Sequence, residues 1–509
     1  MDFVKNVAEF EHLWIALVIG IVLLVAWYGM APFSFFKNLG IPGPTPWPFL
    51  GNLPQIMSKP HQMFLFDKEV AEKYGRVAGV YLGRMPAYVI SDVDLIKQIT
   101  VKEFSKFPNR PLSSIGSQSV FDNKSLLALE DEEWRRIRVT ITPTFSALKL
   151  KQITPLVHQS AKTLGKKLEQ IAKTGEIVDM WRTYGKFTME VILATAFGVQ
   201  ADIQNDADEQ YTPNAEVLFK QPPLSFILMV FPFMARLFRL VMKLILRSAS
   251  TERSKSAMFL AKATQEVMRM RRESGAAQRK DLLELMMKAE VTDSEGKKVS
   301  KLTDGEVLSQ SFTFILAGYE TTSNALAYTT YCLALNPEVQ EKLIEEIDGA
   351  VGDDENAAYD TVQNLEYLDM VLNEALRLYP PASRFGRAVK ESCTLNGVQF
   401  VKGSVVVFPV YHLHRDPEYW PDPETFDPER FSQEAKQQRS PYCFLPFGTG
   451  PRSCIGMRFA LMEAKMALVH ILKRFKFERS AETEEPLELK ATITMAPKNG
   501  IRVKIVSRE

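Results

Sequence analysis

The stretch FGTGPRSCIG, residues 447–456, places one of the chain's four cysteines, Cys454, in a loop framed by glycines. Glycines at these positions permit turns that a Cβ would forbid, and they let the loop lie flat against a broad planar group. Residues 457–472 follow with apolar helical spacing, so the amides at the start of that helix would stabilise a thiolate on Cys454. The motif alone leaves two interpretations open, a ligand loop and a structural turn.

The other three cysteines lack such a frame, and the chain contains no C-x-x-C motif, so the pattern does not indicate a zinc site. Four cysteines in 509 residues also exclude a disulfide-framework protein and are typical of a reducing compartment. Lys and Arg number 62 against 61 Asp and Glu, a formal charge of +1, which argues against nucleic acid as a partner. With 46% hydrophobic and 24% charged residues, the composition is that of an ordinary globular protein.

An uncharged apolar run covers residues 13–36, and about 20 helical residues suffice to span the hydrocarbon layer of a membrane. We expect an N-terminal segment, residues 1–36, that contains one membrane anchor helix at about residues 13–32. A cleaved signal peptide is the competing interpretation, but acidic residues outnumber lysine before the run and Lys37 follows it. That distribution favours a retained single-pass anchor with the rest of the chain on the cytoplasmic side.

A proline-rich connector follows the apolar run. The sequence GIPGPTPWP, residues 40–48, cannot continue a helix, because its prolines fix φ and remove amide donors. We therefore expect a stiff, extended connector at residues 37–50. Length alone would allow roughly three domains after it. No second linker and no repeat follows, so we expect one catalytic domain over residues 51–509.

The pattern of that domain predicts a fold that is mostly α with a minor β region (α+β). Short β-branched runs predict strands at residues 76–90 and 403–410. A second apolar stretch, residues 222–246, is too interrupted by proline and charge to span a membrane; core packing and a lid resting on the membrane both remain open. Apolar recurrence at three and four residues predicts helices over residues 153–173, 252–274, 303–335, 337–350, 361–379 and 457–474.

The cysteine loop resembles the haem-ligand motif of the cytochrome P450 family, F-x-x-G-x-x-x-C-x-G, at Phe447, Gly450, Cys454 and Gly456. The resemblance implies the cytochrome P450 fold behind a single N-terminal transmembrane helix, with haem b (iron protoporphyrin IX) as the cofactor. It implies that Cys454 is the thiolate axial ligand of the haem iron, a ligand that favours O–O cleavage. Phe447 would pack beside the sulfur and limit its access to solvent.

Two further motifs match the family in order along the chain. Glu374 and Arg377 lie at i and i+3, a spacing that by itself indicates an ordinary helical ion pair worth a few tenths of a kcal/mol. The resemblance pairs them with Arg430 in a buried scaffold, which is not a catalytic role. Trp134 and Arg138 form the motif W-x-x-x-R, and the resemblance implies that both donate to one haem propionate.

The third motif, Ala317-Gly318-Tyr319-Glu320-Thr321, interrupts a long apolar helix with a glycine, an acid and a hydroxyl. Threonine hydroxyls in such positions bond back to carbonyls and bend helices. The motif resembles the family pattern A-G-x-[DE]-T, which implies a bent helix that crosses the haem beside Ala317 and leaves room for dioxygen. The resemblance assigns Thr321 to hydrogen bonding with the dioxygen that is reduced, and Glu320 to relaying protons toward it.

Three more arginines match positions that pair with haem propionates in the family. They are Arg452, two residues before the cysteine, Arg387, which follows a proline turn, and Arg110. Haem carries two carboxylates, which need cationic partners in a buried site.

The resemblance covers the whole chain, and stretches such as CIGMRFA (residues 454–460) resemble the family 3 group of animal microsomal enzymes. It implies a monooxygenase of the endoplasmic reticulum membrane that inserts one oxygen atom from O₂ into lipophilic substrates, such as xenobiotics, steroids or fatty acids. The implied partners are NADPH-cytochrome P450 reductase as the electron source, cytochrome b5, membrane lipid and the lipophilic substrate.

Two alternatives keep the haem but change the function. A haem-thiolate isomerase or dehydratase acting on lipid peroxides needs no proton relay, so the pair Glu320 and Thr321 favours the monooxygenase. A non-enzymatic haem protein would consume no oxygen with NADPH. By analogy with the family, the substrate pocket would be lined by residues 113–121, 222–238 and 381–382, with Thr313, Leu316, Ala317 and Thr321.

Overall fold

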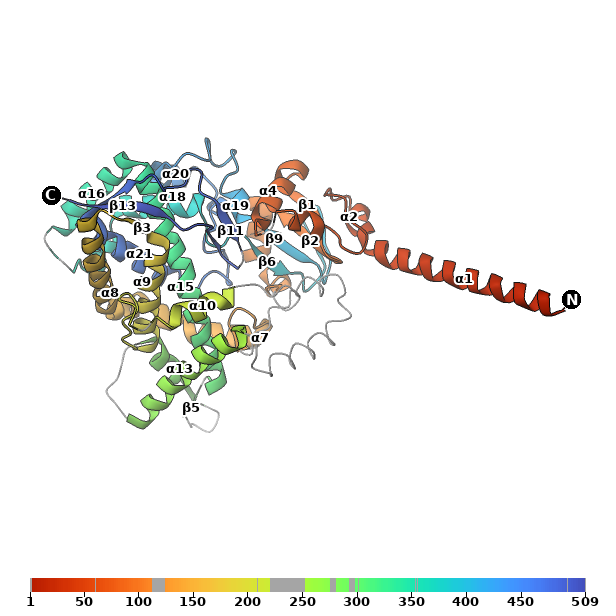
Figure 1. Cartoon of the computed structure of the whole chain (residues 1–509), viewed down its shortest axis with the longest axis horizontal. Helices are drawn as coiled ribbons and strands as arrows, with labels where there is room; N and C mark the ends of the chain where they lie inside the picture. Colours follow the sequence, from red (N-terminus) through yellow and green to blue (C-terminus); the bar gives the residue numbers. More distant parts are fainter. Residues whose placement is uncertain are drawn as a thin grey trace.

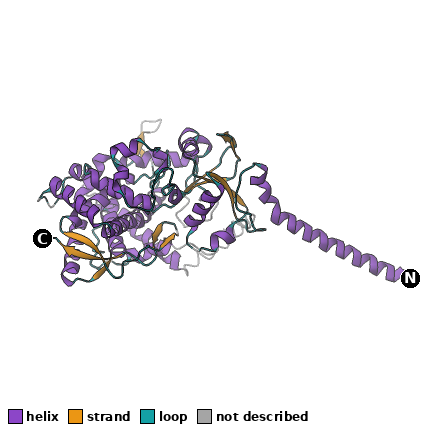
Figure 2. Ribbon diagram, turned by 90° about the horizontal axis from the view of Figure 1, so that it is seen from above, coloured by secondary structure: helices purple, strands orange, loops and turns teal. Residues whose placement is uncertain are grey.

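The computed structural model describes residues 2–508 apart from 60, 112–123, 208, 220–251, 275–280, 293–297, 301, 353, 355 and 492. Helices make up most of the body, and the strands gather in several small sheets (Figures 1 and 2). The predicted fold class, mostly α with a minor β region, is therefore confirmed. The predicted apolar stretch at residues 222–246 lies outside the described residues.

The described helices are α1 (Asp2–Met30), α2 (Phe35–Asn38), α3 (Leu53–Met57), α4 (Met63–Tyr74), α5 (Val93–Lys97), α7 (Asp131–Ile141), α8 (Ala147–Thr174), α9 (Met180–Phe197), α10 (Tyr211–Phe219), α13 (Glu252–Ser274), α14 (Leu282–Met287), α15 (Asp304–Leu335), α16 (Pro337–Val351), α17 (Tyr359–Gln363), α18 (Glu366–Leu378), α19 (Val410–Leu413), α20 (Gln433–Gln437) and α21 (Met457–Leu472). The described strands are β1 (Val77–Leu82), β2 (Met85–Ile90), β3 (Ile177–Asp179), β4 (Glu290–Thr292), β5 (Lys298–Ser300), β6 (Phe385–Ala388), β7 (Cys393–Leu395), β8 (Val398–Phe400), β9 (Val405–Phe408), β10 (Phe475–Arg479), β11 (Leu489–Ala491), β12 (Met495–Pro497) and β13 (Arg502–Ser507).

The N-terminal helix α1 extends away from the body (Figure 1). The stretch Trp14–Asn38 has a mean hydropathy of 2.3, and its length and composition suffice to cross a membrane. Its residues from Trp14 to Trp27 are exposed, whereas Phe36 is buried against the body. The prediction of one apolar N-terminal helix is confirmed.

The proline-rich connector after α1 lies against the first sheet. The Gly79 amide donates to Pro42 O at 2.8 Å. A Cβ on Gly43 would lie 1.9 Å from Gly79 O, so glycine is what allows this close approach. The connector is therefore joined to β1 by a backbone hydrogen bond where the body begins.

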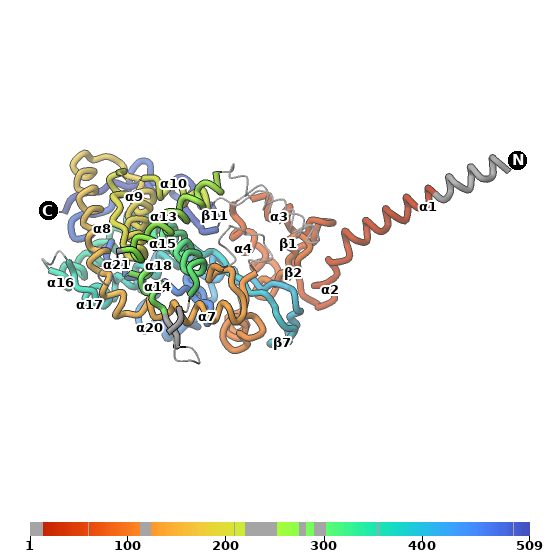
Figure 3. Tube along the Cα trace, turned by 90° about the horizontal axis from the view of Figure 1, so that it is seen from below, coloured from red at the N-terminus to blue at the C-terminus, as the bar shows by residue number. Residues whose placement is uncertain are grey.

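Helix α15 runs through the middle of the body, where it packs against α9, α18 and α21 (Figures 1 and 3). Its start is fixed by a capping box: Thr303 Oγ1 accepts from the Glu306 amide, and the Glu306 carboxylate accepts from the Thr303 amide at 2.7 Å. It ends at Leu335, and the proline two residues later starts α16. The predicted helix over residues 303–335 is confirmed.

The four-stranded sheet has the order β1-β2-β9-β6, with β2 and β9 parallel and the other pairs antiparallel. The strands predicted at residues 76–90 and 403–410 are β1, β2 and β9. In the β6–β9 pair, Arg387 lies opposite Val406. This register places a fully buried arginine at the edge of the sheet that faces the cysteine loop.

One predicted helix is divided. The pattern over residues 361–379 predicts a single helix, but the structure has α17 and α18, separated at Asn364 and Leu365. The reason is tertiary: the Glu346 carboxylate of α16 accepts from the amides of Tyr367 and Leu368, at 2.7 and 2.9 Å. That carboxylate caps the start of α18, so a new helix begins there.

Candidate functional site

The loop that carries Cys454 is held by backbone contacts that require its glycines. Gly448 and Gly450 adopt φ values of +66° and +74°. A Cβ on Gly450 would lie 2.0 Å from Thr100 O. The Cys454 amide donates to Phe447 O at 2.9 Å, which closes the loop just before α21. Phe447 is half-buried and packs against the main core.

Cys454 differs from the other cysteines in its surroundings. It is exposed, whereas Cys332 and Cys443 are buried and Cys393 is half-buried. Burial nevertheless raises the pKa of the Cys454 thiol, while the amides of Gly456 and Met457 and two guanidinium groups lower it. The sulfur therefore lies deep in the protein, where the surrounding atoms displace water from it. Part of its own surface nevertheless touches no protein atom. This combination suits a ligand sulfur better than a structural turn.

Arginines from three distant segments converge on the cysteine loop. Arg110 Nη2 donates to Arg452 O at 3.3 Å, and Arg387 Nη2 donates to Thr449 O at 3.4 Å. Arg452 is anchored by Pro108 O at 2.8 Å, Leu129 O at 2.9 Å and Asn109 Oδ1 at 3.2 Å. The structure therefore brings together the arginines predicted from residues far apart in sequence.

This arginine cluster is short of negative charge. Within the described part of the chain, Arg110, Arg138, Arg387 and Arg452 form no ion pair, and Arg387 Nε and Arg452 Nη1 are buried without a hydrogen-bond partner. Burial and the neighbouring guanidinium groups lower the pKa of Arg387 and of Arg452 to about 9. Buried cations left uncompensated are costly, so the cluster fits an anionic group with more than one carboxylate.

Trp134 and Arg138 lie one turn apart on α7, as the W-x-x-x-R motif predicts. Trp134 is buried, and its ring lies 4.0 Å from the Arg452 guanidinium. Arg138 is half-buried, and the Cys454 thiolate raises its pKa against the larger effect of burial, which lowers it. Both residues therefore belong to the cysteine site.

Near its middle, α15 has residues that are exposed or half-buried, although most of the helix is buried. Ala317 is exposed, although most of the helix around it is buried, and Thr321 one turn later is half-buried. Thr321 Oγ1 donates to Ala317 O at 2.6 Å, which is the back-bond expected of a mid-helix threonine.

The mid-helix glycine has a packing role. A Cβ on Gly318 would lie 2.9 Å from Ile192 Cδ1 on α9. Gly318 therefore permits the close packing of α15 on α9. The helix is continuous from Asp304 to Leu335.

Glu320 is half-buried on α15, and Thr494 and Lys490 of the C-terminal part of the chain act on its carboxyl. Burial raises the pKa of Glu320 to about 7, while the Thr494 hydroxyl and the Lys490 ammonium lower it. Its Oε2 is buried, and no hydrogen-bond partner for it lies among the described residues. A carboxyl that changes protonation near neutral pH is suited to moving protons.

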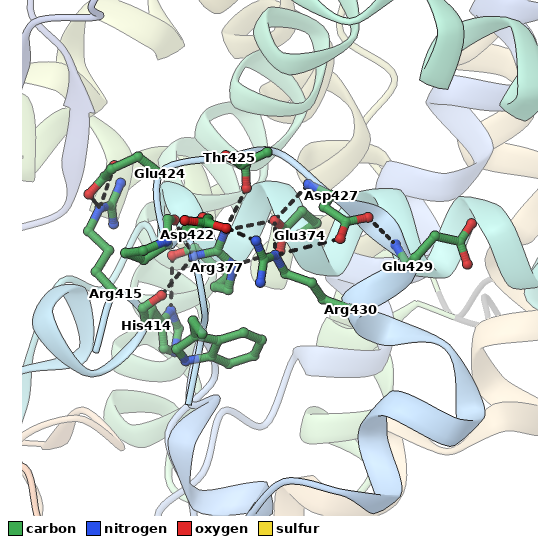
Figure 4. A network of polar contacts seen from close by, with 12 residues as sticks. Glu374, Arg377, His414, Arg415, Asp422, Glu424, Thr425, Asp427, Glu429 and Arg430 are labelled. Carbon is green, nitrogen blue, oxygen red and sulfur yellow. Dashed lines mark hydrogen bonds and ion pairs between the residues drawn. The ribbon is translucent and has the colours of Figure 1, made fainter. Parts of the chain in front are cut away.

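The predicted scaffold of Glu374, Arg377 and Arg430 is present and fully buried at its centre (Figure 4). Arg377 donates to both Glu374 oxygens, at 2.6 and 2.7 Å, and Arg430 Nε lies 3.5 Å from Glu374 Oε1. Arg377 Nη1 also donates to His414 O and Pro423 O. The pair is therefore much more than the exposed helical ion pair that its spacing alone indicates.

His414, which the sequence motifs do not single out, joins this scaffold to the cysteine loop. Its Nδ1 lies 3.2 Å from Arg377 O, and its Nε2 accepts from the Leu445 amide at 2.8 Å, two residues before Phe447. Both contacts are to backbone atoms, so no side-chain pattern could reveal them. Burial is the largest cause that lowers the pKa of His414, and together with the Arg377 and Arg415 guanidinium groups it brings this pKa to about 3.

This histidine gives a pH prediction. In the unfolded chain a histidine binds a proton near pH 6.5, whereas folded His414 stays neutral down to about pH 3. Because the unfolded state binds more protons in this window, the free energy of unfolding falls as the pH falls below 6.5, by up to about 1.4 kcal/mol per unit. We expect His414→Asn to weaken the pH dependence of the urea unfolding midpoint between pH 7 and 5. The exposed His61→Asn should leave it unchanged, and equal slopes for all three proteins would contradict the assignment.

Some predicted pocket residues can be placed. Thr313 is buried, its hydroxyl lying 2.8 Å from Ser125 Oγ, while Leu316 is half-buried. Pro381 is buried and Ala382 is exposed. Residues 113–121 and 222–238 lie outside the described part of the chain.

Haem fits the residues of this site. The haem iron needs a ligand atom with free surface, and the deep Cys454 sulfur provides one. The two haem carboxylates need cationic partners, and the arginine nitrogens without a hydrogen-bond partner can provide them.

Comparisons with known proteins agree with this geometry. The sequence model of the family described as Cytochrome P450 matches residues 41–505. Cytochrome P450 3A41 of Mus musculus is 41% identical over 501 residues, which are 97% of each chain. Cytochrome P450 3A9 of Rattus norvegicus and cytochrome P450 3A5 of Homo sapiens are each 40% identical over 514 residues, 100% of this chain and 99% of theirs.

The protein is thus a haem-thiolate enzyme, an oxidoreductase that binds haem b. The chain belongs to the cytochrome P450 family, the monooxygenases, and its relatives named above are all of the 3A group.

Proposed function

We propose that this P450 inserts one oxygen atom from O₂ into lipophilic substrates, with electrons from NADPH delivered by a flavoprotein reductase and with cytochrome b5 as a further partner. The main support for this proposal is the site itself: the deep Cys454 sulfur lies beside four arginines that have no ion-pair partner among the described residues. Xenobiotics, steroids and fatty acids are the substrate classes, because Ala317 and Ala382, two exposed residues among those expected to line the pocket, are small and apolar.

In this proposal the Cys454 thiolate would bind the haem iron and Phe447 would shield its sulfur. Arg110, Arg138, Arg387 and Arg452, with Trp134, would hold the propionates. When bound, the haem supplies the activation of dioxygen, for which a thiolate ligand favours O–O cleavage.

The chain itself supplies the protons. The Thr321 hydroxyl can donate toward the open side of α15 once it rotates from Ala317 O, and Glu320 can return a proton to that region. The balance of the reaction requires this supply: one substrate, one O₂, two electrons and two protons give the hydroxylated product and one water.

The anchored arrangement is part of the proposal. Residues 1–36 would hold the enzyme in the endoplasmic reticulum membrane, residues 37–50 would connect it, and residues 51–509 would form the catalytic domain on the cytoplasmic side. The exposed apolar stretch Trp14–Asn38 supports the anchor.

The test is reconstitution of the purified full chain with reductase in phospholipid vesicles under ¹⁸O₂, with a mixed panel of steroids, fatty acids and drug-like compounds. We expect products that carry one ¹⁸O atom and that require NADPH. Turnover of fatty-acid peroxides without NADPH, and no labelled product from the panel, would replace the proposal with the isomerase or dehydratase.

Thr321→Ala is expected to uncouple electron use from product formation. The ratio of product to NADPH consumed should fall by about 10-fold to 100-fold, with a matching rise in hydrogen peroxide, because a donor hydroxyl is lost. Thr329→Ala is the matched control, since Thr329 Oγ1 makes the same back-bond on the same helix, to Ala325 O at 2.8 Å. Equal ratios in both variants would remove Thr321 from the mechanism.

A further inference from the structure

Asn109 lies between two residues that contact Arg452 of the cysteine loop. Pro108 O accepts from Arg452 Nε at 2.8 Å, and Arg110 Nη2 donates to Arg452 O at 3.3 Å. Asn109 itself is buried, with 7% of its surface exposed, and its Oδ1 accepts from Arg452 Nη2 at 3.2 Å. Three consecutive residues therefore hold one arginine, and Asn109 is the one among them that uses a neutral side chain.

The same asparagine also holds the start of α7 and one end of β6. Its Oδ1 accepts from the Asp131 backbone amide at 2.9 Å, and its Nδ2 donates to Asp131 Oδ1 at 3.2 Å. Asp131 has a φ of +48°, in the left-handed region that residues other than glycine seldom adopt, so this reciprocal pair of bonds stabilises a strained position. The backbone carbonyl of Asn109 accepts from the Ala388 amide of β6 at 2.9 Å, next to Arg387. Asn109 thus joins α7 and β6 to the cysteine loop.

All the acceptors on the Arg452 guanidinium are neutral oxygens: Pro108 O, Leu129 O and Asn109 Oδ1. Arg452 is only 3% exposed, and its Nη1 has no hydrogen-bond partner among the described residues. Neutral acceptors fix the plane of a guanidinium but leave its charge uncompensated, whereas a carboxylate in the same place would form an ion pair with it. Both the charge and Nη1 therefore stay available to an anionic group of a ligand.

The acids near Arg452 do not take this place. Burial lowers the pKa of Arg452 most, and the charges of Glu130 and Asp131 oppose that effect, but neither acid forms an ion pair with it. Asp131 pairs instead with Lys390 at 2.9 Å, and this bond lowers the pKa of the Asp131 carboxyl. Because Asp131 Oδ1 accepts from both Lys390 and Asn109, the nearest carboxylate is already engaged.

We propose that Asn109 is a positioning residue of the haem site: its neutral oxygen holds Arg452 in place for a haem propionate without neutralising the charge that binds the propionate. The inference rests on the proposed function, in which Arg452 pairs with a propionate. Asn109 acts through Arg452 in this role. Asparagine meets the demand because its side chain both accepts and donates hydrogen bonds and carries no charge.

The first measurement is the rate at which haem passes from the purified full-length holoenzyme to excess apomyoglobin. Asn109→Leu removes the acceptor at nearly constant side-chain size, and we expect it to speed haem loss about 10-fold, since Arg452 loses a bond that orients it. Asn52→Leu is the matched control. Asn52 is also fully buried, and its Oδ1 accepts from the amide of Tyr81 on β1, the edge strand opposite β6. This control should lower stability without changing the rate of haem loss.

The second measurement separates charge from shape. The double variant Asn109→Asp with Asp131→Asn exchanges the two side chains, so their mutual hydrogen bonds can form with donor and acceptor reversed, and the total charge is unchanged. The negative charge now lies on the oxygen that contacts Arg452, while the exposed partner Lys390 loses little. We expect faster haem loss, by several-fold, and a shift of the propionate bending band in the resonance Raman spectrum, because Arg452 is neutralised within the protein.

Arg452→Leu sets the scale for both measurements, with haem loss expected to rise about 10-fold to 100-fold. If Arg452→Leu changes neither the rate nor the Raman band, Arg452 is not a propionate partner, which is a failure of the proposed function. If it changes both, but Asn109→Leu behaves like Asn52→Leu, the positioning role of Asn109 is overturned. A wild-type rate and band in the exchanged protein would overturn the need for a neutral oxygen. Where Asn109→Leu yields no holoenzyme, the exchanged protein decides alone.

Discussion

Cys454→Ser is expected to abolish the thiolate-type absorption band of the reduced carbon monoxide complex and all NADPH-dependent product formation. A serine hydroxyl does not ionise in the range where a cysteine does, so no anionic sulfur-like ligand replaces the thiolate. The surrounding amides of Gly456 and Met457 and the guanidinium groups would then have no thiolate to stabilise. The measurement is the difference spectrum of the purified full-length protein, normalised to protein concentration.

The control is the same substitution at another cysteine. Cys393 is half-buried on β7, where it is paired with Phe400 of β8. Cys393→Ser should keep the absorption band and the activity. A band that survives Cys454→Ser, or that is lost equally in both variants, would remove Cys454 as the ligand.

Glu374→Gln is expected to have the largest effect on stability, a loss of about 3–5 kcal/mol in the free energy of unfolding. The substitution keeps the size of the side chain but leaves the fully buried Arg377 without its carboxylate and Arg430 with only the more distant Asp427, at 4.0 Å. A buried charge that loses its partner retains the desolvation cost without the attraction that offset it. Urea unfolding of the full-length holoenzyme, followed by tryptophan fluorescence and by haem absorption, measures the change.

Glu429→Gln provides the matched comparison. Glu429 pairs with Lys342 at 2.5 Å, but both side chains are more than half exposed, at 54% and 55%. Exposed pairs are worth about 0–1 kcal/mol, so this variant should unfold within about 1 kcal/mol of the wild type. Equal losses in the two variants would show that the buried scaffold is no more important than a surface ion pair.

The sequence motifs predicted the parts of the site that depend on side-chain type at fixed spacing. Cys454 and its glycines were recognisable because a close approach such as that of Gly450 to Thr100 O tolerates no other residue. The arginines were recognisable as candidates, and the structure brings Arg110, Arg387 and Arg452 to one loop. Their roles toward haem stay predictions, which the experiments above address.

The parts that could not be predicted depend on backbone atoms and on contacts between distant segments. His414 bonds to two backbone groups, so its role leaves no trace in a motif. Gly318 was read from the family pattern, whereas its packing against Ile192 is visible only when α9 and α15 are placed together. The division of α17 from α18 follows from a carboxylate on another helix, Glu346, and not from local propensity.

The anchoring of Arg452 has a consequence for biosynthesis. Its guanidinium bonds to backbone oxygens of Pro108 and Leu129, early in the chain, while the arginine itself lies near the end. During translation from the N-terminus, the early segments therefore emerge long before the residue that ties them to the cysteine loop. The site can close only after most of the chain has left the ribosome. Under the proposed assignment of Cys454 and Arg452 to the haem site, cofactor capture would be a late event, and the amount of haem bound would report whether the two ends of the chain have met correctly.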